Sequence, residues 1–220
     1  MFTGIIEATG TVRNLQQVGE EYWLTVKTRK LDLADVKVGD SIAVDGCCLT
    51  VVDLGDNYFS AYVSQETLRH TTLGSLERDS RVNLEKAMLA SSRFSGHIVS
   101  GHVDGVGAVV SIKPEGKSLQ FEFELPSNLA KYAAAKGSIC VDGVSLTINT
   151  VSDTGFSINV IPHTQDETVI ADYSVSQQVN IEVDLVARYL ERLIQAGQDV
   201  ESASAIIDMN FLKTHGFQST

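Results

Sequence analysis

Hydrophobic residues in this 220-residue chain occur in short runs that polar residues and glycines interrupt. In the first half, six runs are rich in β-branched and aromatic residues: 4–13, 21–28, 40–44, 48–53, 58–63 and 81–84. Short runs of this composition, bounded by turn residues, are typical of β-strands. Because no long helical run separates them, they predict a small closed antiparallel barrel.

The pattern of the first half returns in the second half at an offset of 97 residues. This offset places residues 3–7 on 100–104, residues 44–51 on 141–148, and residues 82–85 on 179–182. The comparison requires one gap, near Gly39 and Gly137, which is absorbed within a few residues. A constant offset across separated blocks indicates one fold used twice, so we predict two all-β barrels with two similar pockets.

The last part of the chain changes to helical spacing. Asp184 is placed to begin a helix and Gly197 to end it. A helix of about 12–14 residues is marginal alone in water, so we expect it to pack on the barrels or, as we favour, on another subunit. Its apolar stripe consists of Leu185, Val186, Tyr189, Leu190, Leu193 and Ile194. Other helical segments are expected only at 129–135 and 85–91, and residues 200–220 are predicted to be loosely ordered.

The composition is that of an ordinary globular protein, with 43% apolar and 20% charged residues. The formal net charge of −11 argues against nucleic acid and anionic membranes as partners, because both favour basic surfaces. No run approaches the ~20 apolar residues of a membrane-spanning helix, and no secretory leader is visible, so we expect a cytoplasmic protein. The three cysteines do not form a disulfide framework, and the five histidines lack zinc-ligand spacing.

The strand at residues 47–51 carries the first candidate chemistry. Alternate side chains of a strand face opposite sides, so positions 47, 49 and 51 are predicted to be core. Cys48 and Thr50 then share the other face, as Ser145 and Thr147 do in the second half. That face is either solvated or the wall of a pocket. Because a thiol is more acidic and more nucleophilic than a hydroxyl, Cys48 would make two similar pockets chemically unequal.

His102 stands where the first half has Ile5. It is either a structural histidine or a proton-transfer group, since its ordinary pKa suits acid–base catalysis. A metal site that pairs His102 with His97 lacks further ligands. Lys136, in a turn of the second half, is most simply a solvated surface lysine. Polar residues after the fifth strand of each half lie at a barrel end and are either solvated or ligand-binding: Glu66, Thr67, His163 and Thr164.

Several segments, in order and repeated internally, resemble riboflavin synthase of the α-chain type: residues 1–7, 45–50, 66–68, 96–105, 142–147 and 179–184. The resemblance covers about residues 1–195. It implies two tandem six-stranded Greek-key barrels related by a pseudo-two-fold axis, a C-terminal helix, a homotrimer, and no metal or organic cofactor. The domains would be residues 1–96, residues 97–184, and an oligomerisation helix with its tail at residues 185–220.

The resemblance also implies a reaction, in which two molecules of 6,7-dimethyl-8-ribityllumazine dismutate by transfer of a four-carbon unit. Two copies of one substrate need two similar sites that face each other, and a duplicated barrel provides them. The implied ligand contacts of the first half are Gly4, Ile5, Ile6, Cys48, Leu49, Thr50, Tyr62, Val63, Ser64, Gln65, Glu66 and Thr67. Those of the second half are Gly101, His102, Val103, Lys136, Ser145, Leu146, Thr147, Asn159, Val160, Ile161, Pro162, His163 and Thr164.

Four residues receive catalytic roles as hypotheses. His102 would remove a proton from the 7-methyl group of one lumazine, with Thr147 nearby. Cys48, or a water that it holds, would polarise the acceptor ring, and Phe2 would pack against a ring. Two other readings remain: a lumazine- or flavin-binding antenna protein without catalysis, and a structural tandem barrel without a ligand. The second leaves Cys48 and the paired threonines unexplained.

Overall fold

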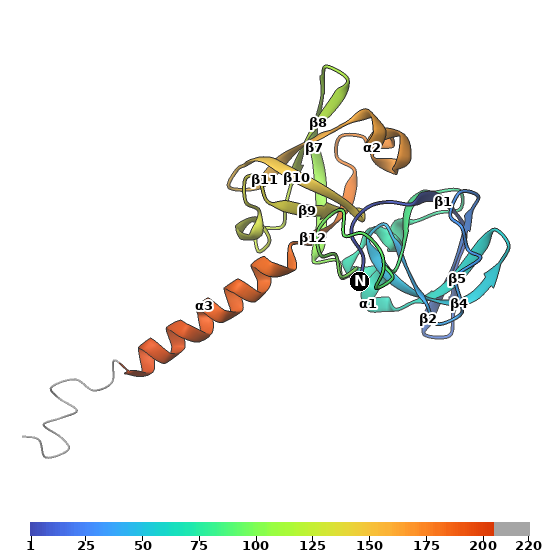
Figure 1. Cartoon of the computed structure of the whole chain (residues 1–220), viewed down its shortest axis with the longest axis horizontal. Helices are drawn as coiled ribbons and strands as arrows, with labels where there is room; N and C mark the ends of the chain where they lie inside the picture. The colour runs from blue at the N-terminus through green and yellow to red at the C-terminus, as the bar shows by residue number, and fades with distance from the viewer. Residues whose placement is uncertain (205–220) are drawn as a thin grey trace, which may run out of the picture. The chain divides into compact units, whose positions relative to one another are not determined.

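The computed structural model describes residues 1–204, with side chains described as far as residue 196. It contains two closed barrels of six antiparallel strands each (Figure 1). The first consists of β1 (Ala8–Val18), β2 (Glu21–Thr28), β3 (Ser41–Val44), β4 (Cys47–Gly55), β5 (Tyr58–Val63) and β6 (Arg81–Lys86). The second consists of β7 (Gly105–Glu115), β8 (Ser118–Glu124), β9 (Ser138–Val141), β10 (Val144–Val151), β11 (Gly155–Val160) and β12 (Gln178–Val183). The predicted pair of barrels is confirmed.

Both barrels have the same topology. The order around the first barrel is β1-β2-β5-β4-β3-β6, and the second has the equivalent order β7-β8-β11-β10-β9-β12. Three consecutive strands, β3 to β5, pair in sequence, and β2 lies beside β5, which is the Greek-key connection. Closure removes the unpaired edges that an open sheet of this size would expose.

Each barrel encloses its own hydrophobic core. In β4 the buried side chains are those of Cys47, Leu49 and Val51, and Cys48 and Thr50 lie on the other face. The predicted alternation is therefore confirmed, and β10 repeats it. Full burial of one aliphatic side chain of this size stabilises the fold by roughly 1.5–3 kcal/mol, which fixes the register of the strand.

The offset of 97 residues holds without the expected gap. The amide of Gly39 donates a hydrogen bond to the carbonyl of Val51 over 2.8 Å, and that of Lys136 donates to Ile148 over the same distance. Each pair is 97 residues from the other, and both Gly39 and Lys136 have a left-handed φ, of +99° and +68°. The equivalent of Lys136 is therefore Gly39, and the prediction of a gap beside Gly137 is wrong.

The first strand begins later than predicted. The sequence indicated a strand over residues 4–13, and β1 spans Ala8–Val18. Residues before Ala8 follow a different course because they contact the second barrel: the amide of Ser145 donates a hydrogen bond to the carbonyl of Gly4 over 2.7 Å. Strand composition gave no sign of this contact, and Gly4 has a left-handed φ of +75° instead of an extended backbone.

Short helices close one end of each barrel. They are α1 (Gln65–His70) and α2 (Pro162–Glu167), followed by 3₁₀ turns at Thr72–Ser75 and Val169–Asp172. The helix predicted at residues 129–135 is reduced to a 3₁₀ turn, Ala130–Tyr132. The helix predicted at residues 85–91 is absent from this part of the structure, because β6 continues to Lys86 and pairs with β3.

The C-terminal helix α3 spans Leu185–Ser204 and is longer than predicted. It passes Gly197, which the sequence suggested as its end. A single glycine inside a helix costs about 1 kcal/mol, and the helix formers around it, such as Ala196 and Glu201, sustain the helix. Loose order was predicted for residues 200–220; residues 200–204 are helical, and 205–220 lie outside the described residues. No helix within residues 1–204 is both long and apolar enough to cross a membrane.

The two barrels lie in one compact unit, residues 1–184. Their junction is reciprocal: the side-chain amide of Asn83 donates to the carbonyl of Asp142 over 2.9 Å, and that of Asn180 donates to Asp45 over 2.8 Å. Asn83 and Asn180 are equivalent residues of the repeat, as are Asp45 and Asp142. This exchange is the pseudo-two-fold relation that the duplication predicted.

Candidate functional site

Each barrel carries the residues that the sequence singled out on the outer face of one strand, β4 in the first barrel and β10 in the second. We call these two places the first edge and the second edge. On β4, Cys48 is half-buried and Thr50 is exposed. On β10, Ser145 is half-buried and Thr147 is exposed. Each barrel therefore presents the same two small polar positions on the outer face of the same strand, with the thiol on one barrel only.

The segment that approaches each edge belongs to the other half of the chain: residues 100–103 approach the first edge, and residues 3–6 approach the second. We call them the crossing segments. The amide of Cys48 donates a hydrogen bond to the carbonyl of Gly101 over 2.8 Å, as Ser145 does to Gly4. Val103 packs against the first core and Ile6 against the second. The sequence grouped Gly4, Ile5 and Ile6 with the first half and Gly101, His102 and Val103 with the second. In the structure Gly4 and Ile6 also contact the second barrel, and Gly101 and Val103 also contact the first. A repeat offset identifies equivalent segments but does not show which barrel each one contacts.

Glycine is required where each segment crosses. Gly101 has a φ of +81° and Gly4 a φ of +75°, a backbone conformation that side chains disfavour. A Cβ atom on Gly101 would lie 2.6 Å from the Cβ of Cys48, and one on Gly4 would lie 2.6 Å from the Cβ of Ser145. The backbone therefore lies directly against the two candidate side chains.

Buried carboxylates hold both crossing segments. Glu85 accepts hydrogen bonds from the amides of Thr3 and Gly4, over 2.7 and 3.0 Å. Glu182 accepts from the amides of Ser100 and Gly101, over 2.6 and 3.0 Å. Burial raises the pKa of both carboxyls, and these hydrogen bonds partly oppose the rise.

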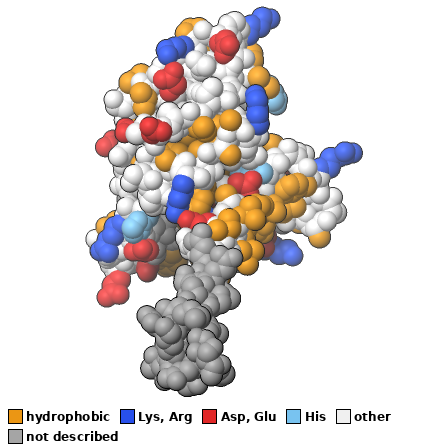
Figure 2. Space-filling view, turned by 90° about the vertical axis from the view of Figure 1, so that its left-hand side faces the viewer, with side chains coloured by type: hydrophobic (Ala, Val, Ile, Leu, Met, Phe, Trp, Pro, Cys, Tyr) orange, Lys and Arg blue, Asp and Glu red, His pale blue; other side chains and the backbone are white. Residues whose placement is uncertain are grey.

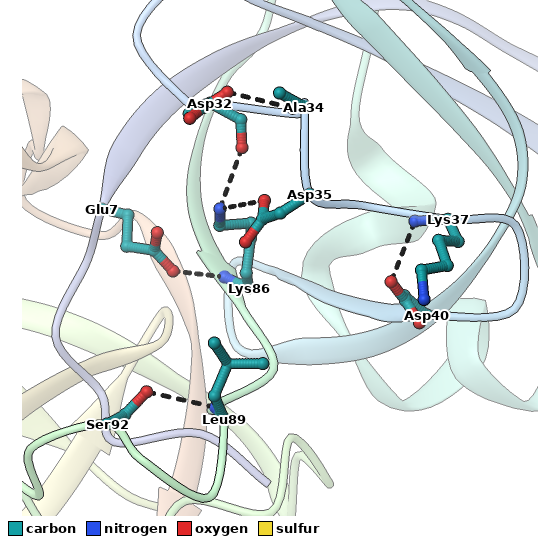
Figure 3. A network of polar contacts seen from close by, with 9 residues as sticks. All are labelled: Glu7, Asp32, Ala34, Asp35, Lys37, Asp40, Lys86, Leu89 and Ser92. Carbon is teal, nitrogen blue, oxygen red and sulfur yellow. Dashed lines mark hydrogen bonds and ion pairs between the residues drawn. The ribbon is translucent and has the colours of Figure 1, made fainter.

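Lys86 fixes the N-terminal segment from the other side (Figure 3). Its amide donates to the carboxylate of Glu7 over 2.7 Å, and its ammonium group contacts Asp35 over 2.7 Å and the carbonyl of Asp32 over 2.9 Å. A cavity of about 500 Å³ beside this network is lined by Ile5 and Lys86. The segment is thus held at Glu7 by the amide of Lys86.

The ends of both barrels carry the remaining predicted contacts. Ser64 caps α1 by accepting a hydrogen bond from the amide of Thr67 over 3.0 Å. Glu66 is exposed and lies 3.1 Å from His70, and the ring of Tyr62 is 48% exposed. Gln65, Ile161, Pro162 and His163 are also exposed, and Thr164 is half-buried. These residues therefore leave both polar and apolar side chains exposed after the fifth strand of each barrel.

Some predicted contact residues point elsewhere. The side chains of Leu49, Val63, Leu146 and Val160 are buried in the two cores and face away from the outer surface. Asn159 is exposed and its amide donates to Glu115 on the neighbouring hairpin. Lys136 is exposed in its left-handed turn.

Phe2 does not lie on an open surface. Its side chain is 0% exposed and packs with Ala43, Val99 and Cys140, residues of both barrels. Its backbone pairs with Val99. The ring of Phe2 therefore forms part of the junction between the barrels, and its contact with a ligand ring stays a prediction.

Cys48 is the accessible thiol of this chain. Cys47 and Cys140 are both buried, and burial raises the pKa of each well above its ordinary value. A thiol with a raised pKa stays protonated and unreactive. Within residues 1–204, no group of three or more histidine, cysteine or acidic side chains could hold a metal ion.

His97 is a functional candidate to which the sequence analysis gave no catalytic role. Its Nδ1 atom lies 2.7 Å from the hydroxyl of Ser145, and its Nε2 atom is buried without a hydrogen-bond partner among the described residues. Burial lowers the pKa of His97, although Asp184 opposes the effect. A neutral imidazole can accept the hydroxyl proton of Ser145. The repeat could not reveal this pair, because the equivalent of His97 would precede residue 1.

The two edges are thus similar in shape and different in chemistry. The first combines Cys48 with a crossing segment that carries the exposed His102, and the second combines Ser145 with the buried His97. Figure 2 shows that hydrophobic side chains gather in continuous areas on one face of the molecule, between charged groups. Such areas are typical of interaction surfaces.

Comparison with known proteins agrees with this architecture. The lumazine binding domain matches twice, at residues 3–87 and 100–184. Riboflavin synthase of Photobacterium phosphoreum is 48% identical over 217 residues, which cover 99% of each chain. That of Bacillus subtilis is 42% identical over 217 residues, which cover 99% of this chain and 100% of the relative.

Solved structures show the same fold. The crystal structure of LumP complexed with riboflavin has a TM-score of 0.77 at 26% identity, and covers 83% of this chain and 99% of that chain. LumP complexed with 6,7-dimethyl-8-(1'-D-ribityl) lumazine has a TM-score of 0.75 with the same coverage. With two matched domains and relatives aligned along the whole length, this chain belongs to the lumazine binding domain family.

Proposed function

We propose that this protein is a riboflavin synthase. It takes two molecules of 6,7-dimethyl-8-ribityllumazine and transfers a four-carbon unit from one to the other, giving riboflavin and 5-amino-6-(D-ribitylamino)uracil. The observation that carries the proposal is the pair of equivalent edges with unequal chemistry, Cys48 on one and Ser145 with His97 on the other. One substrate acts as donor and the other as acceptor, so the reaction needs two similar sites that treat their ligands differently.

Proximity supplies most of the rate enhancement in this proposal. Holding two reactants in the correct geometry can lower a barrier by roughly 7–11 kcal/mol. Hydrogen bonds within the chain to Glu85, Glu182 and Lys86 hold the crossing segments, so little further ordering is needed when a ring binds. The exposed hydroxyls of Thr50 and Thr147, and the backbone amides beside them, would form hydrogen bonds with the polar atoms of each ring.

The proton of the donor's 7-methyl group has two candidate acceptors. His102 lies in the segment that contacts Cys48 at the first edge. The pair of His97 and Ser145 lies at the second edge, where a lowered pKa keeps the imidazole neutral and able to accept a proton. Cys48 would polarise the acceptor ring.

A second copy of the chain would complete the site. Both edges are open, and helix α3, described by itself, carries an exposed apolar stripe that includes Leu190 and Leu193. We therefore propose a homotrimer in which the first barrel of one subunit faces the second barrel of its neighbour. The three domains that the sequence suggested and a cytoplasmic location remain predictions.

The test mixes the full chain with the lumazine and follows riboflavin absorbance. We expect turnover in the wild type, and slower single-turnover rates in Cys48→Ser, His102→Gln and His97→Gln at unchanged lumazine affinity. A matched control is Cys140→Ser, since that thiol is buried between the barrels and away from both edges. Wild-type rates in all three variants would refute the assignment, and lumazine bound without conversion would support a binding protein instead.

A further inference from the structure

A hollow on the outer face of the first barrel combines arginines with aromatic rings. Its volume is about 540 Å³. It is lined by Arg13, Asn14, Trp23, Thr25, Asp53, Tyr58, Ser60 and Arg78. None of these residues belongs to the two edges described above, so the hollow has no role in the proposed reaction.

Local structure brings the two arginines together. Strand β1 shifts register directly after Val12, which places Arg13 in a bulge. The turn that contains Arg78 is held against this bulge, because Asp79 donates its amide to the carbonyl of Val12 and the amide of Val12 donates to Ser80, both over 2.8 Å. Asp79 adopts a left-handed φ of +70° in that turn. The backbone therefore places both arginines at the lining of the hollow.

The aromatic side of the hollow is also fixed. The indole N–H of Trp23 donates to the hydroxyl of Thr25 over 3.2 Å, and that hydroxyl lies 3.0 Å from the one of Ser60. The ring of Tyr62 meets Trp23 edge-on, with centroids 5.0 Å apart. Because the polar group of Trp23 is already satisfied, its ring can offer a flat apolar surface to a ligand.

The arginines themselves have no partner. Among the described residues, neither Arg13 nor Arg78 makes a hydrogen bond or an ion pair, and Asp53 is the acidic residue of the lining. In a chain of net charge −11, the two guanidinium groups outnumber the single carboxylate of this lining, so the lining has a net positive charge. Guanidinium groups bind phosphate through paired hydrogen bonds.

The second barrel provides an internal comparison. It has a hollow of about 420 Å³ at the equivalent place, where Val110 replaces Arg13 and Gln120 replaces Trp23. At the position of Arg78 it has Val175. The barrel therefore forms its bulge, turn and hollow without arginine or tryptophan, and the fold does not account for their presence in the first barrel.

We propose that this hollow binds a small aromatic phosphate ester, with the phosphate held by Arg13 and Arg78 and the ring against Trp23. The proposal is independent of the enzymatic reaction. Trp23 is the single tryptophan of the chain, so any change in tryptophan fluorescence originates at this residue.

The experiment titrates the full-length protein with phenyl phosphate, and separately with inorganic phosphate and phenol. We expect a saturable change in tryptophan fluorescence with phenyl phosphate, at a Kd at least about tenfold lower than for either fragment. The variant Arg13→Val/Arg78→Val copies the second barrel and should weaken binding at least about tenfold. The control Arg29→Gln/Lys117→Gln removes the same charge elsewhere and should bind as the wild type does.

Three results would overturn the proposal. They are the absence of saturable binding by both fluorescence and calorimetry, equal affinity in the valine variant, and equal weakening in the control. Equal binding of inorganic phosphate and phenyl phosphate would overturn the role of Trp23. Because riboflavin formation is measured separately, failure here leaves the proposed reaction unaffected.

Discussion

The carboxyl group of Asp142 should make the stability of the fold depend on pH near neutrality. Asp142 is 5% exposed at the junction of the barrels. It accepts hydrogen bonds from the amide of Asn180 over 2.6 Å and the hydroxyl of Tyr173 over 2.5 Å. Burial nevertheless raises its pKa from the ordinary value of 3.8 to about 7. Burial, together with the charge of Asp142, also raises the pKa of Asp45.

The direction of the pH dependence of stability follows from which state, folded or unfolded, binds the proton of Asp142 more tightly. The folded state holds the proton of Asp142 up to about pH 7, and the unfolded state loses it near pH 3.8. Stability from this group is therefore fully present below pH 3.8 and is lost as the pH rises through 7. One pKa unit corresponds to about 1.4 kcal/mol, so the whole effect is about 4 kcal/mol, of which about 2 kcal/mol falls between pH 5 and pH 7.

The perturbation is Asp142→Asn, which keeps an acceptor for Asn180 and places an amide beside the Tyr173 hydroxyl without a charge. Urea unfolding at fixed protein concentration, at pH 5, 6 and 7, measures the free energy of unfolding. We expect the wild type to lose about 2 kcal/mol relative to the variant across this range. Asp56→Asn, in an exposed turn, is the matched control. Parallel pH profiles of the wild type and Asp142→Asn would refute the reasoning.

Three further perturbations separate local contacts from the general fold. Gly101→Ala should destabilise by at least about 2 kcal/mol more than Gly19→Ala in urea unfolding, because both have positive φ but only Gly101 faces another side chain within 4 Å. Asn180→Ala removes hydrogen bonds that join the barrels and should cost about 1–3 kcal/mol in the same assay; an unchanged midpoint would contradict the role of the junction. Removal of residues 185–220 should yield monomers in sedimentation velocity and abolish turnover, and a turnover-competent monomer would contradict the proposed intersubunit site.

Much of the fold could be predicted because the sequence repeats. The alternation at residues 47–51 and its copy at 144–148 fixed which side chains are core, since the period of a strand is two. The gap near Gly39 was an error of alignment, because a lysine in a left-handed turn gives no sign that it replaces a glycine. The predicted end of the C-terminal helix at Gly197 was wrong for a related reason, because local composition does not show whether a helix tolerates one unfavourable residue.

The candidate site was predicted less completely than the fold. The polar positions Cys48, Thr50, Ser145 and Thr147 followed from strand periodicity. Their partners did not, because Gly4 and Gly101 contact the opposite barrel, and no pattern in the chain records that contact. His97 lies 48 residues from Ser145 in sequence and has no counterpart in the first repeat, so only the folded structure brings the two together.

The two crossing segments determine how a fragment that contains a single barrel would behave. A fragment that holds only the first barrel would lack Gly101, and the amide of Cys48 would lose its acceptor. The same fragment contains Gly4, the pseudo-symmetric equivalent of Gly101, which in the whole chain serves Ser145. Two such fragments can therefore exchange the segments that precede β1, each supplying the carbonyl that the other needs, and an internal pseudosymmetry would become the true two-fold axis of a homodimer.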